Sequence, residues 1–278
     1  MQRDLSQAVL DPSAAVAAKL AERQRQDKRK EVFFPILAWA SVVGGILLWE
    51  MVGRSIGGSL FLATPLQTWF EIVDLWRAGE LQKHIWVSGQ EFIYGYVIAS
   101  VFGIVIGLVM AAYRTGSALL GPWVSALYAT PIIAVAPLVI LWFGIGIWSK
   151  IVVVLSVVIF PVIINTEAGI RATDRHLIEA IRSFGANQFQ IFTKVSLPSA
   201  LPFILAGLRL GIGRGLVGVV VGELFGARAG VGFMILQAAE SFAMPKLFAG
   251  VIVLAAAGIS LTAGFHYLEK KLVPWNRS

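Results

Sequence analysis

Two arginines, Arg209 and Arg214, lie inside a long apolar stretch that is otherwise rich in glycine. A guanidinium is always charged, and holding it at the centre of a membrane costs at least roughly 2.5–3.5 kcal/mol. Each arginine therefore needs an acid, a carbonyl oxygen, water or an anion beside it. Two glutamates, Glu167 and Glu223, end apolar stretches of this chain. The sequence leaves two roles open: a structural ion pair, such as Arg209 with Glu167, or direct contact of an arginine with an anionic substrate.

Other residues that could carry chemistry are few and scattered. The chain has no cysteine, which excludes disulfides and thiolate metal sites. Its histidines, His84, His176 and His266, are far apart and lack the spacing of metal ligands. No GxxxxGK[ST] loop is present to cradle phosphates. We therefore expect no catalytic residue, no metal and no cofactor bound by this chain, and an integral-membrane enzyme is disfavoured.

The elements that must position the arginines are membrane spans. Of 278 residues, 57% are hydrophobic and 14% are charged, whereas soluble domains average about 45–50% apolar and about 25% charged. A membrane-crossing helix needs about 20 apolar residues. Six runs approach that length, at 33–53, 88–112, 122–144, 148–168, 200–223 and 247–268. The first follows a polar, basic arm and is interpreted as a retained span rather than a signal peptide. The sequence predicts an all-α integral membrane protein.

The basic residues indicate how the spans are oriented. Net charge is +7, but the bases cluster at segment ends, which favours a membrane protein over a nucleic-acid-binding one. With the N-terminus inside, 15 of the 23 lysines and arginines lie on the cytoplasmic side, 6 lie outside, and Arg209 and Arg214 lie within the fifth span. This bias predicts a multi-pass membrane protein with both termini in the cytoplasm.

Two further segments carry patterns of their own. Residues 64–79, TPLQTWFEIVDLWRAG, place aromatic and aliphatic side chains on one helical stripe, which predicts a short helix in the outer membrane interface. The third span contains Pro131 and Pro137, and each proline removes a helical hydrogen bond and favours a kink. Two interpretations of this kinked span remain: it forms a wall of the transport pathway, or the kink only serves helix packing. The candidate pathway residues are Thr130, Pro131, Pro137, Arg209, Arg214 and Glu223.

The fifth span carries small residues on one face. The glycines Gly207, Gly211, Gly218 and Gly222 share this face with Arg214, at steps of three or four residues. Such spacing lets helix backbones approach closely, so the stripe predicts a close-packed helix or subunit interface.

A polar segment separates the fourth and fifth spans. The residues HLIEAIRSFG (176–185) predict a short amphipathic helix, and Gly185 stands where a C-terminal cap needs positive φ. A second helix is expected to begin at Asn187, with Gln190 completing a capping box. Pro198 and Pro202 suit the start of the fifth span. The segment has no nucleophile–base pair, so its shape suits contact with another protein.

Residues 179–198, EAIRSFGANQFQIFTKVSLP, resemble the motif E-A-A-x3-G-x9-I-x-L-P of the permease subunits of binding-protein-dependent ABC importers. The matching positions are Glu179, Ala180, Ile181 for the second alanine, Gly185, Val195 for the isoleucine, Leu197 and Pro198. Residues 64–69, 131–150 and 207–226 are similar to the nitrate, sulfonate and taurine branch, although Ile132 stands where that branch often has a second proline. Arg214 and Glu167 are not part of the motif.

The resemblance implies a type I importer permease fold of about six spans. It implies a homodimer that works with two cytoplasmic ATPase subunits, which bind the ATP-Mg, and with a periplasmic or lipid-anchored binding protein; membrane lipid is the remaining partner, and no nucleic acid is expected. In the family the motif helix is a coupling helix that rests in a cleft of the ATPase. The coupling residues carried over are Glu179, Ala180, Ile181, Phe184, Gly185, Ala186, Leu197 and Pro198.

The expected organisation is a cytoplasmic arm (1–32), a first span with an interfacial helix (33–83), a transporter core (84–268) and a cytoplasmic tail (269–278). The expected function is ATP-driven import of a small anionic solute, such as a sulfonate, nitrate or an organic acid, by switching between two packings. The alternative is an ATPase-independent secondary transporter or channel. Intramembrane charges fit that alternative, but it leaves the capped cytoplasmic helix pair unexplained.

Overall fold

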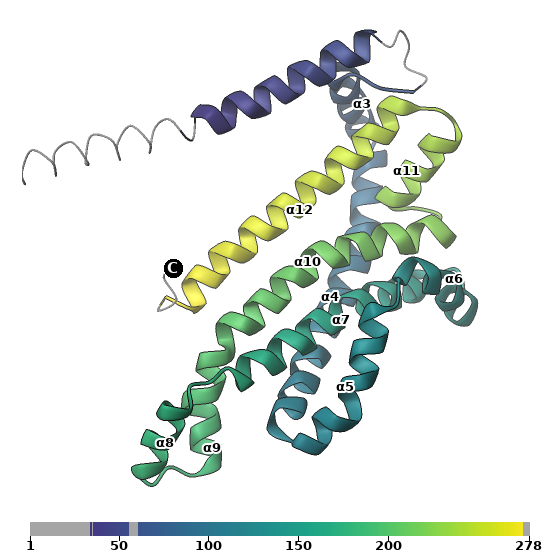
Figure 1. The fold of residues 1–278 in the computed structure, drawn as a ribbon. Helices are drawn as coiled ribbons and strands as arrows, with labels where there is room; N and C mark the ends of the chain where they lie inside the picture. The colour runs from purple at the N-terminus through teal and green to yellow at the C-terminus, as the bar shows by residue number, and fades with distance from the viewer. Residues whose placement is uncertain (1–33, 35, 56–60, 275–278) are drawn as a thin grey trace, which may run out of the picture. The chain divides into compact units, whose positions relative to one another are not determined.

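The computed structural model describes residue 34, residues 36–55 and residues 61–274 of the chain, which are helical and contain no strand (Figure 1). The predicted arm at 1–32 lies outside this part. The described residues form two compact units. The first unit contains the described residues up to 55 together with Thr64–Leu66. The second contains residues 61–63 and the described residues from Gln67 onward. The predicted all-α class is confirmed.

Among the described residues, five helices are long and apolar enough to cross a membrane. They are Ile36–Ser55, α4 (Glu80–Ala112), α7 (Ile147–Arg171), the continuous helix Gln188–Gly226 and α12 (Met244–Leu272). A sixth span exists if α5 (Arg114–Ala129) and α6 (Ile132–Phe143) count together, since they meet at a 101° bend. The third predicted span corresponds to this bent pair. Its break falls at Pro131, as expected, whereas α6 continues through Pro137.

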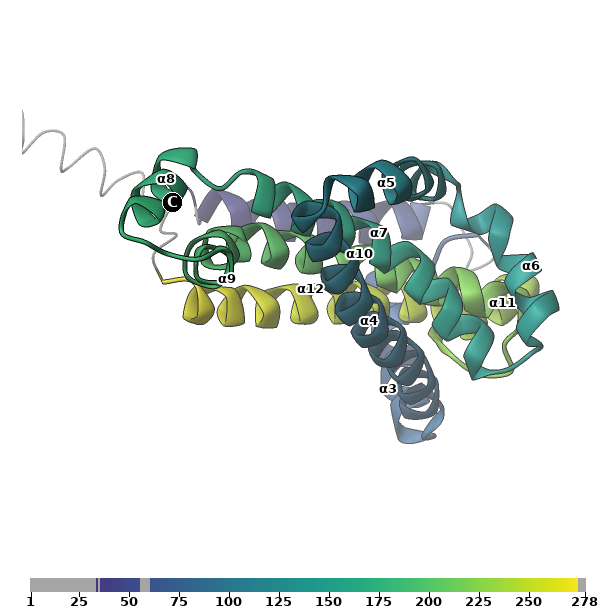
Figure 2. The ribbon, with the colours of Figure 1, turned by 90° about the horizontal axis from the view of Figure 1, so that it is seen from below.

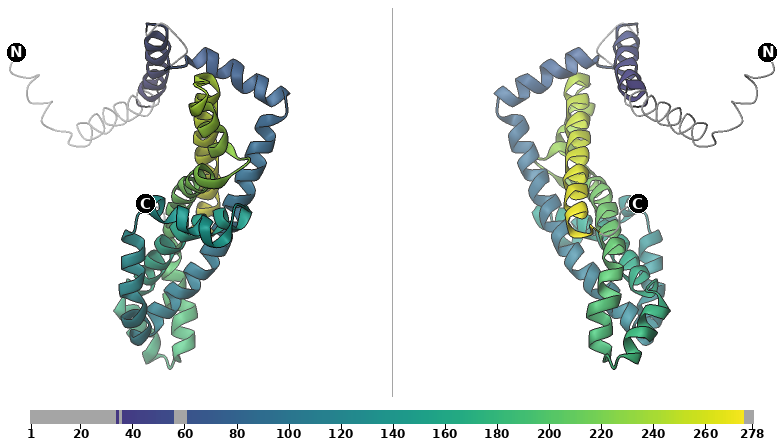
Figure 3. Two further views of the ribbon diagram at one scale, coloured as in Figure 1. Left: turned by 90° about the vertical axis from the view of Figure 1, so that its right-hand side faces the viewer. Right: turned by 90° about the vertical axis from the view of Figure 1, so that its left-hand side faces the viewer.

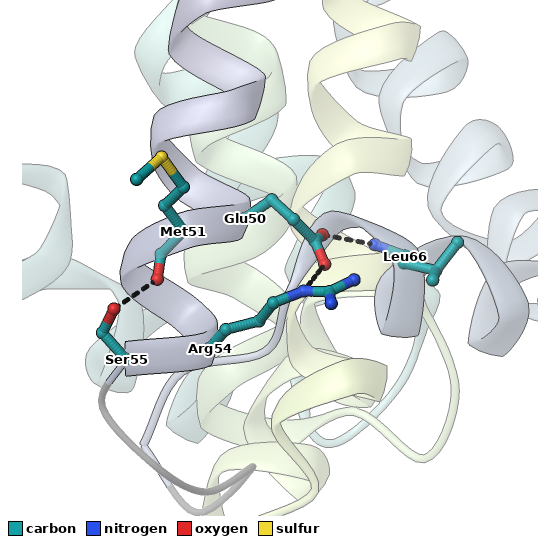
Figure 4. Close-up of polar contacts among 5 residues, drawn as sticks. All are labelled: Glu50, Met51, Arg54, Ser55 and Leu66. Carbon is teal, nitrogen blue, oxygen red and sulfur yellow. Dashed lines mark hydrogen bonds and ion pairs between the residues drawn. The ribbon is translucent and has the colours of Figure 1, made fainter.

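The first unit contains a small polar contact at the end of its helix. Arg54 Nε donates to Glu50 Oε1 (2.7 Å), and the Leu66 backbone N–H donates to Glu50 Oε2 (3.4 Å; Figure 4). Leu66 is the second residue of α3 (Pro65–Arg77), where free amide groups favour a carboxylate. Ser55 Oγ also bonds back to the Met51 carbonyl oxygen (2.7 Å). The predicted helix at 64–79 is therefore present as α3.

In the second unit, α7 lies between α4 and α10 (Leu197–Gly226), and all three share one apolar core (Figures 1 and 2). That core contains Phe92, Ala99, Val154, Val158, Val162, Ile212 and Val219. Glycines on both flanking helices face α7: a Cβ on Gly103 would overlap Val162, and one on Gly218 would overlap Val157. The predicted glycine stripe of the fifth span is thus a helix interface within the chain. Arg214 stands at its edge and is exposed.

The segment that enters α10 differs from expectation. The sequence predicts a second short helix followed by a separate span beginning near Pro198 and Pro202. Instead, α9 (Gln188–Ile191) runs through a π-helical turn, η1 (Phe192–Ser196), directly into α10, and Pro202 lies inside α10. The Leu197 N–H bonds five residues back to the Phe192 carbonyl oxygen. A widened turn ahead of Pro198 accommodates a residue that lacks an N–H, so no break is needed.

We expect Gly95→Ala in α4 to lower the thermal unfolding midpoint of the detergent-solubilised protein. A Cβ at Gly95 would lie 2.6 Å from the Val154 Cβ and 3.0 Å from the Ile151 carbonyl oxygen, so α4 and α7 would have to separate. Overpacking costs about 1–3 kcal/mol, which outweighs the roughly 1 kcal/mol of helix propensity that alanine contributes over glycine.

Gly89→Ala in the same helix is the matched control, because nothing lies within 4 Å of a Cβ there. Its midpoint is expected to stay unchanged or to rise. Midpoints that fall equally in both variants would contradict the close packing of α4 on α7.

Candidate functional sites

A cavity of about 560 Å³ lies beside the break between α5 and α6. Its wall comes from the end of α5, the start of α6 and the middle of α7 and α10. Most lining side chains are apolar, and the polar ones are Tyr128, Thr130, Ser156 and Arg214. A largely apolar cavity with a few convergent polar groups is typical of a small-molecule site. Of the candidate pathway residues, Thr130, Pro131 and Arg214 line this cavity.

Arg214 is held at the cavity by a single aromatic neighbour. Its Nη2 donates to Tyr128 Oη (2.7 Å), and its guanidinium carbon lies 4.6 Å from the centroid of the Tyr128 ring. A tyrosine face attracts a cation but leaves the positive charge without a counterion. Within the described part of the chain, no carboxylate forms an ion pair with Arg214. The cavity therefore holds a guanidinium whose remaining donors can meet an anion.

Arg209 has a different role. Its Nη1 forms an ion pair with Glu269 Oε2 of α12 (3.0 Å), and His266 lies 3.6 Å from the same oxygen. The predicted pair between Arg209 and Glu167 is wrong. Glu167 instead pairs with Arg171, one turn further along α7 (2.9 Å), and accepts a hydrogen bond from Ser117 Oγ of α5 (2.9 Å). The two residues lie on different helices and turn toward different neighbours.

Two other candidate pathway residues lie outside the cavity. Pro137 is inside α6 and is not among the lining residues. Glu223 is fully buried near the end of α10, where it contacts Ser88 of α4 and the first residues of α11 (Val231–Glu240). Sequence reasoning missed this second polar cluster, although an acid within the predicted span 88–112, Glu91, was a visible signal.

The polar segment between α7 and α10 forms a doubly capped turn. Asp174 caps α8 (Arg175–Ser183) by accepting the His176 N–H (2.9 Å). Gly185 has φ +82°, and the Ala186 N–H bonds to the Ile181 carbonyl oxygen (3.3 Å), which is the pattern of a Schellman cap. Asn187 and Gln190 form the predicted capping box, both bonds being 2.9 Å. The predicted positive φ and second helix start are confirmed.

This turn is open to its surroundings and lies at the end of α10 opposite to α11 (Figures 1 and 3). Phe184 is 91% exposed and Phe189 is 74% exposed, and Glu179 and Ala180 are exposed as well. Aromatic side chains so uncovered on a short helix pair form an exposed apolar patch, which is typical of an interaction surface. In contrast, Leu197 and Pro198 are half-buried in the first turn of α10. The motif therefore extends from the exposed turn into the start of the long helix α10.

The chain is similar to membrane components of ATP-driven importers. Residues 99–274 match the sequence model of a family described as "Binding-protein-dependent transport system inner membrane component". The putative aliphatic sulfonates transport permease protein SsuC of Bacillus subtilis (strain 168) is 36% identical over 84% of this chain and 85% of its own length. The formylaminopyrimidine transport permease protein ThiX of Halalkalibacterium halodurans is 32% identical over 84% of this chain and 92% of its own length. The taurine transport system permease protein TauC of Escherichia coli (strain K12) is 32% identical over 82% of this chain and 85% of its own length.

A solved structure shares the fold. The chain superposes on an inward-facing structure of the MetNI methionine ABC transporter with a TM-score of 0.59, covering 70% of this chain and 97% of that chain. Sequence identity is 20%.

Proposed function

Because the chain belongs to the binding-protein-dependent transport system inner membrane components, the permease subunits of ABC importers, we propose that two copies of it form the pathway for a small anionic solute. Its sequence places it with the sulfonate and taurine branch of that family. ATPase and substrate-binding partners are implied by membership of the family. We propose, in addition, that the permease is a homodimer and that its solute is an anion.

The α8–α9 turn is the proposed contact with the ATPase. Its aromatic side chains are exposed among the residues that the structure describes, and its caps fix their direction. This single observation carries the coupling proposal, because a rigid and exposed helix pair suits a cleft in a second protein. The same residues match the importer motif. We place this turn in the cytoplasm, together with both termini, as the distribution of basic residues favours.

The cavity at Arg214 is the proposed point of contact with the solute. Its guanidinium has one tyrosine partner and no ion pair in the described residues, so an anion entering the cavity meets an unneutralised charge. Two of the three relatives named above are described as permeases for sulfonates or taurine, which carry a sulfonate anion. A sulfonate, nitrate or organic acid anion therefore fits the site.

Reconstitution tests this function. The permease is assembled in proteoliposomes with its cognate ATPase and binding protein, and the binding protein is screened by thermal shift with taurine, methanesulfonate and nitrate. We expect ATP hydrolysis to rise when the loaded binding protein is added. A membrane-impermeant maleimide should label a Phe184→Cys variant, in a chain without native cysteine, only from the side where ATP acts. Solute uptake that proceeds without any ATPase would contradict the proposal and favour a secondary transporter or channel.

A further inference from the structure

The N-terminus of α11 is capped entirely by side chains from other helices. The first amides of a helix have no partner within it. Here four successive N–H groups donate outward, those of Gly230 to His84 Nδ1 (3.0 Å), Val231 to Ser88 Oγ (2.8 Å), and Gly232 and Phe233 to Glu223 Oε2 (2.5 and 3.3 Å). His84 and Ser88 belong to α4, and Glu223 belongs to α10. The start of α11 is thus fixed from both sides.

Two glycines make this approach possible. Gly230 has φ +128°, and a Cβ there would overlap the Glu223 carboxyl group. A Cβ at Gly232 would lie 2.8 Å from Glu223 Oε2. Ser88 Oγ also donates to Glu223 Oε1 (2.5 Å). The carboxyl group of Glu223 therefore receives a hydroxyl and two backbone amides at a place where only a bare backbone fits.

The cluster contains an excess of acids. Glu223 is 0% exposed, Glu91 is 3% exposed and Lys150 is 3% exposed. Lys150 lies within electrostatic range of both glutamates and donates from Nζ to the Gly226 carbonyl oxygen at the end of α10 (2.5 Å). His84 accepts at Nδ1 and is therefore neutral. With both glutamates ionised, one buried negative charge would remain uncompensated, which is strongly unfavourable.

The other charges nearby do not remove the excess. Lys246 of α12 pairs with Glu80 at the start of α4 (3.1 Å), so its charge is used there, and the two other bases near the cluster in sequence, Lys83 and Arg228, are exposed. The first turn of α11 contains no ionisable residue. One of the two glutamates must therefore carry a proton, or a cation must be bound beside them.

The hydrogen bonds distinguish the two glutamates. Glu223 accepts from three donors, as a carboxylate does. Glu91 Oε2 is buried without a partner among the described residues, and Glu91 lies within hydrogen-bonding reach of Glu223. We propose that Glu223, as a carboxylate, is the positioning residue of α11, and that Glu91 beside it carries a proton and donates it to Glu223.

This arrangement ties the far end of α10 to the elements that follow it. Val231 and Met234 of α11 pack with Leu81 of α4 and Ala249 of α12 in a second apolar core. Because Glu223 fixes the start of α11, α11 links α4, α10 and α12 at the end of α10 opposite to the α8–α9 turn (Figure 1). This cluster is part of the chain's own fold and is independent of which solute crosses.

The same substitution at the two glutamates tests the proposal. Glu91→Gln is isosteric with a protonated acid, whereas Glu223→Gln removes a charge and one acceptor oxygen. We expect hydrogen–deuterium exchange in the peptide covering residues 227–240 to be unchanged in Glu91→Gln. In Glu223→Gln it should quicken roughly tenfold or more, because hydrogen bonds to a charged group are the strong ones. Similar exchange in the two variants would overturn the positioning role.

An infrared spectrum locates the proton with the wild type and Glu91→Gln alone, so the test does not depend on whether Glu223→Gln folds. At neutral pH, the purified wild-type permease in lipid nanodiscs should show the C=O stretch of a protonated carboxyl group, with the expected shift in D2O. This band should disappear in Glu91→Gln. A wild-type spectrum without the band, in sodium or in potassium buffer, would overturn the proton assignment and leave a bound cation as the source of charge balance. A band that persists in Glu91→Gln would overturn it as well.

Discussion

Replacing Gly185 by valine is expected to bring ATP-driven uptake close to background while the permease remains inserted in the membrane. Gly185 has φ +82°, and an L-residue in that conformation costs about 1–2 kcal/mol, more when it is β-branched. Nothing lies within 4 Å of a Cβ at this position, so the effect comes from the backbone and not from a clash. The turn would give up its cap, and Phe184 and Phe189 would no longer hold one direction.

Gly185→Asn is the matched control, because asparagine adopts positive φ readily. It should retain most of the uptake. Glu179→Arg supplies a second variant that leaves the backbone alone but reverses the charge on the proposed contact face. The measurements are ATP hydrolysis stimulated by the loaded binding protein, and the amount of complex recovered from membranes. Normal stimulation in Gly185→Val would contradict the role of the α8–α9 turn in coupling.

Replacing Arg214 by glutamine is expected to weaken transport of anions by roughly ten- to a hundredfold at low solute concentration, since hydrogen bonds to charged groups contribute about 1.5–3 kcal/mol. The guanidinium lines the cavity and has no ion-pair partner in the described residues that would be left unpaired by the change. Uptake of taurine, methanesulfonate and nitrate measures the effect. Arg214→Lys keeps the charge but loses the planar fork of donors. Its anion uptake should lie between that of the wild type and that of Arg214→Gln.

Arg209→Gln controls for the loss of an intramembrane arginine in itself. Arg209 is occupied by Glu269 and does not line the cavity, so the variant should keep its apparent affinity for anions. An unchanged affinity for every anion in Arg214→Gln would remove Arg214 from the pathway, and equal losses in both variants would indicate a general defect.

The features that could be predicted from sequence are those fixed within a few residues. The capping box at Asn187 and the positive φ of Gly185 depend on side chains and backbone groups at most five residues apart. The spans follow from length and hydropathy, and the break at Pro131 follows from a missing N–H. Each of these signals is local, so no knowledge of the packing is needed to interpret it.

The features that could not be predicted depend on which distant residues meet as ion-pair or hydrogen-bond partners in the folded chain. Glu269, which pairs with Arg209, lies 60 residues away, whereas Glu167 seemed equally suitable from its position at the end of a span. The short helix α11 was missed because ten residues are too few to cross a membrane. Part of its cap comes from Ser88 and His84, more than 140 residues earlier in the chain. An acid such as Glu91 in an apolar span marks a polar cluster but does not name its members.

The uninterrupted course of α9, η1 and α10 has a mechanical consequence. This helix contains 39 residues, which at a rise of about 1.5 Å per residue corresponds to about 58 Å, or more than the hydrocarbon thickness of a bilayer. It begins at the exposed turn and ends beside the carboxylate that fixes α11. It is long enough to join the two faces of a membrane, and no loop interrupts it to absorb motion. At its π turn the backbone hydrogen bonding changes from the α-helical pattern to a bond five residues back, and Pro202, further along the helix, removes another α-helical bond, so this segment is where we expect the helix to bend.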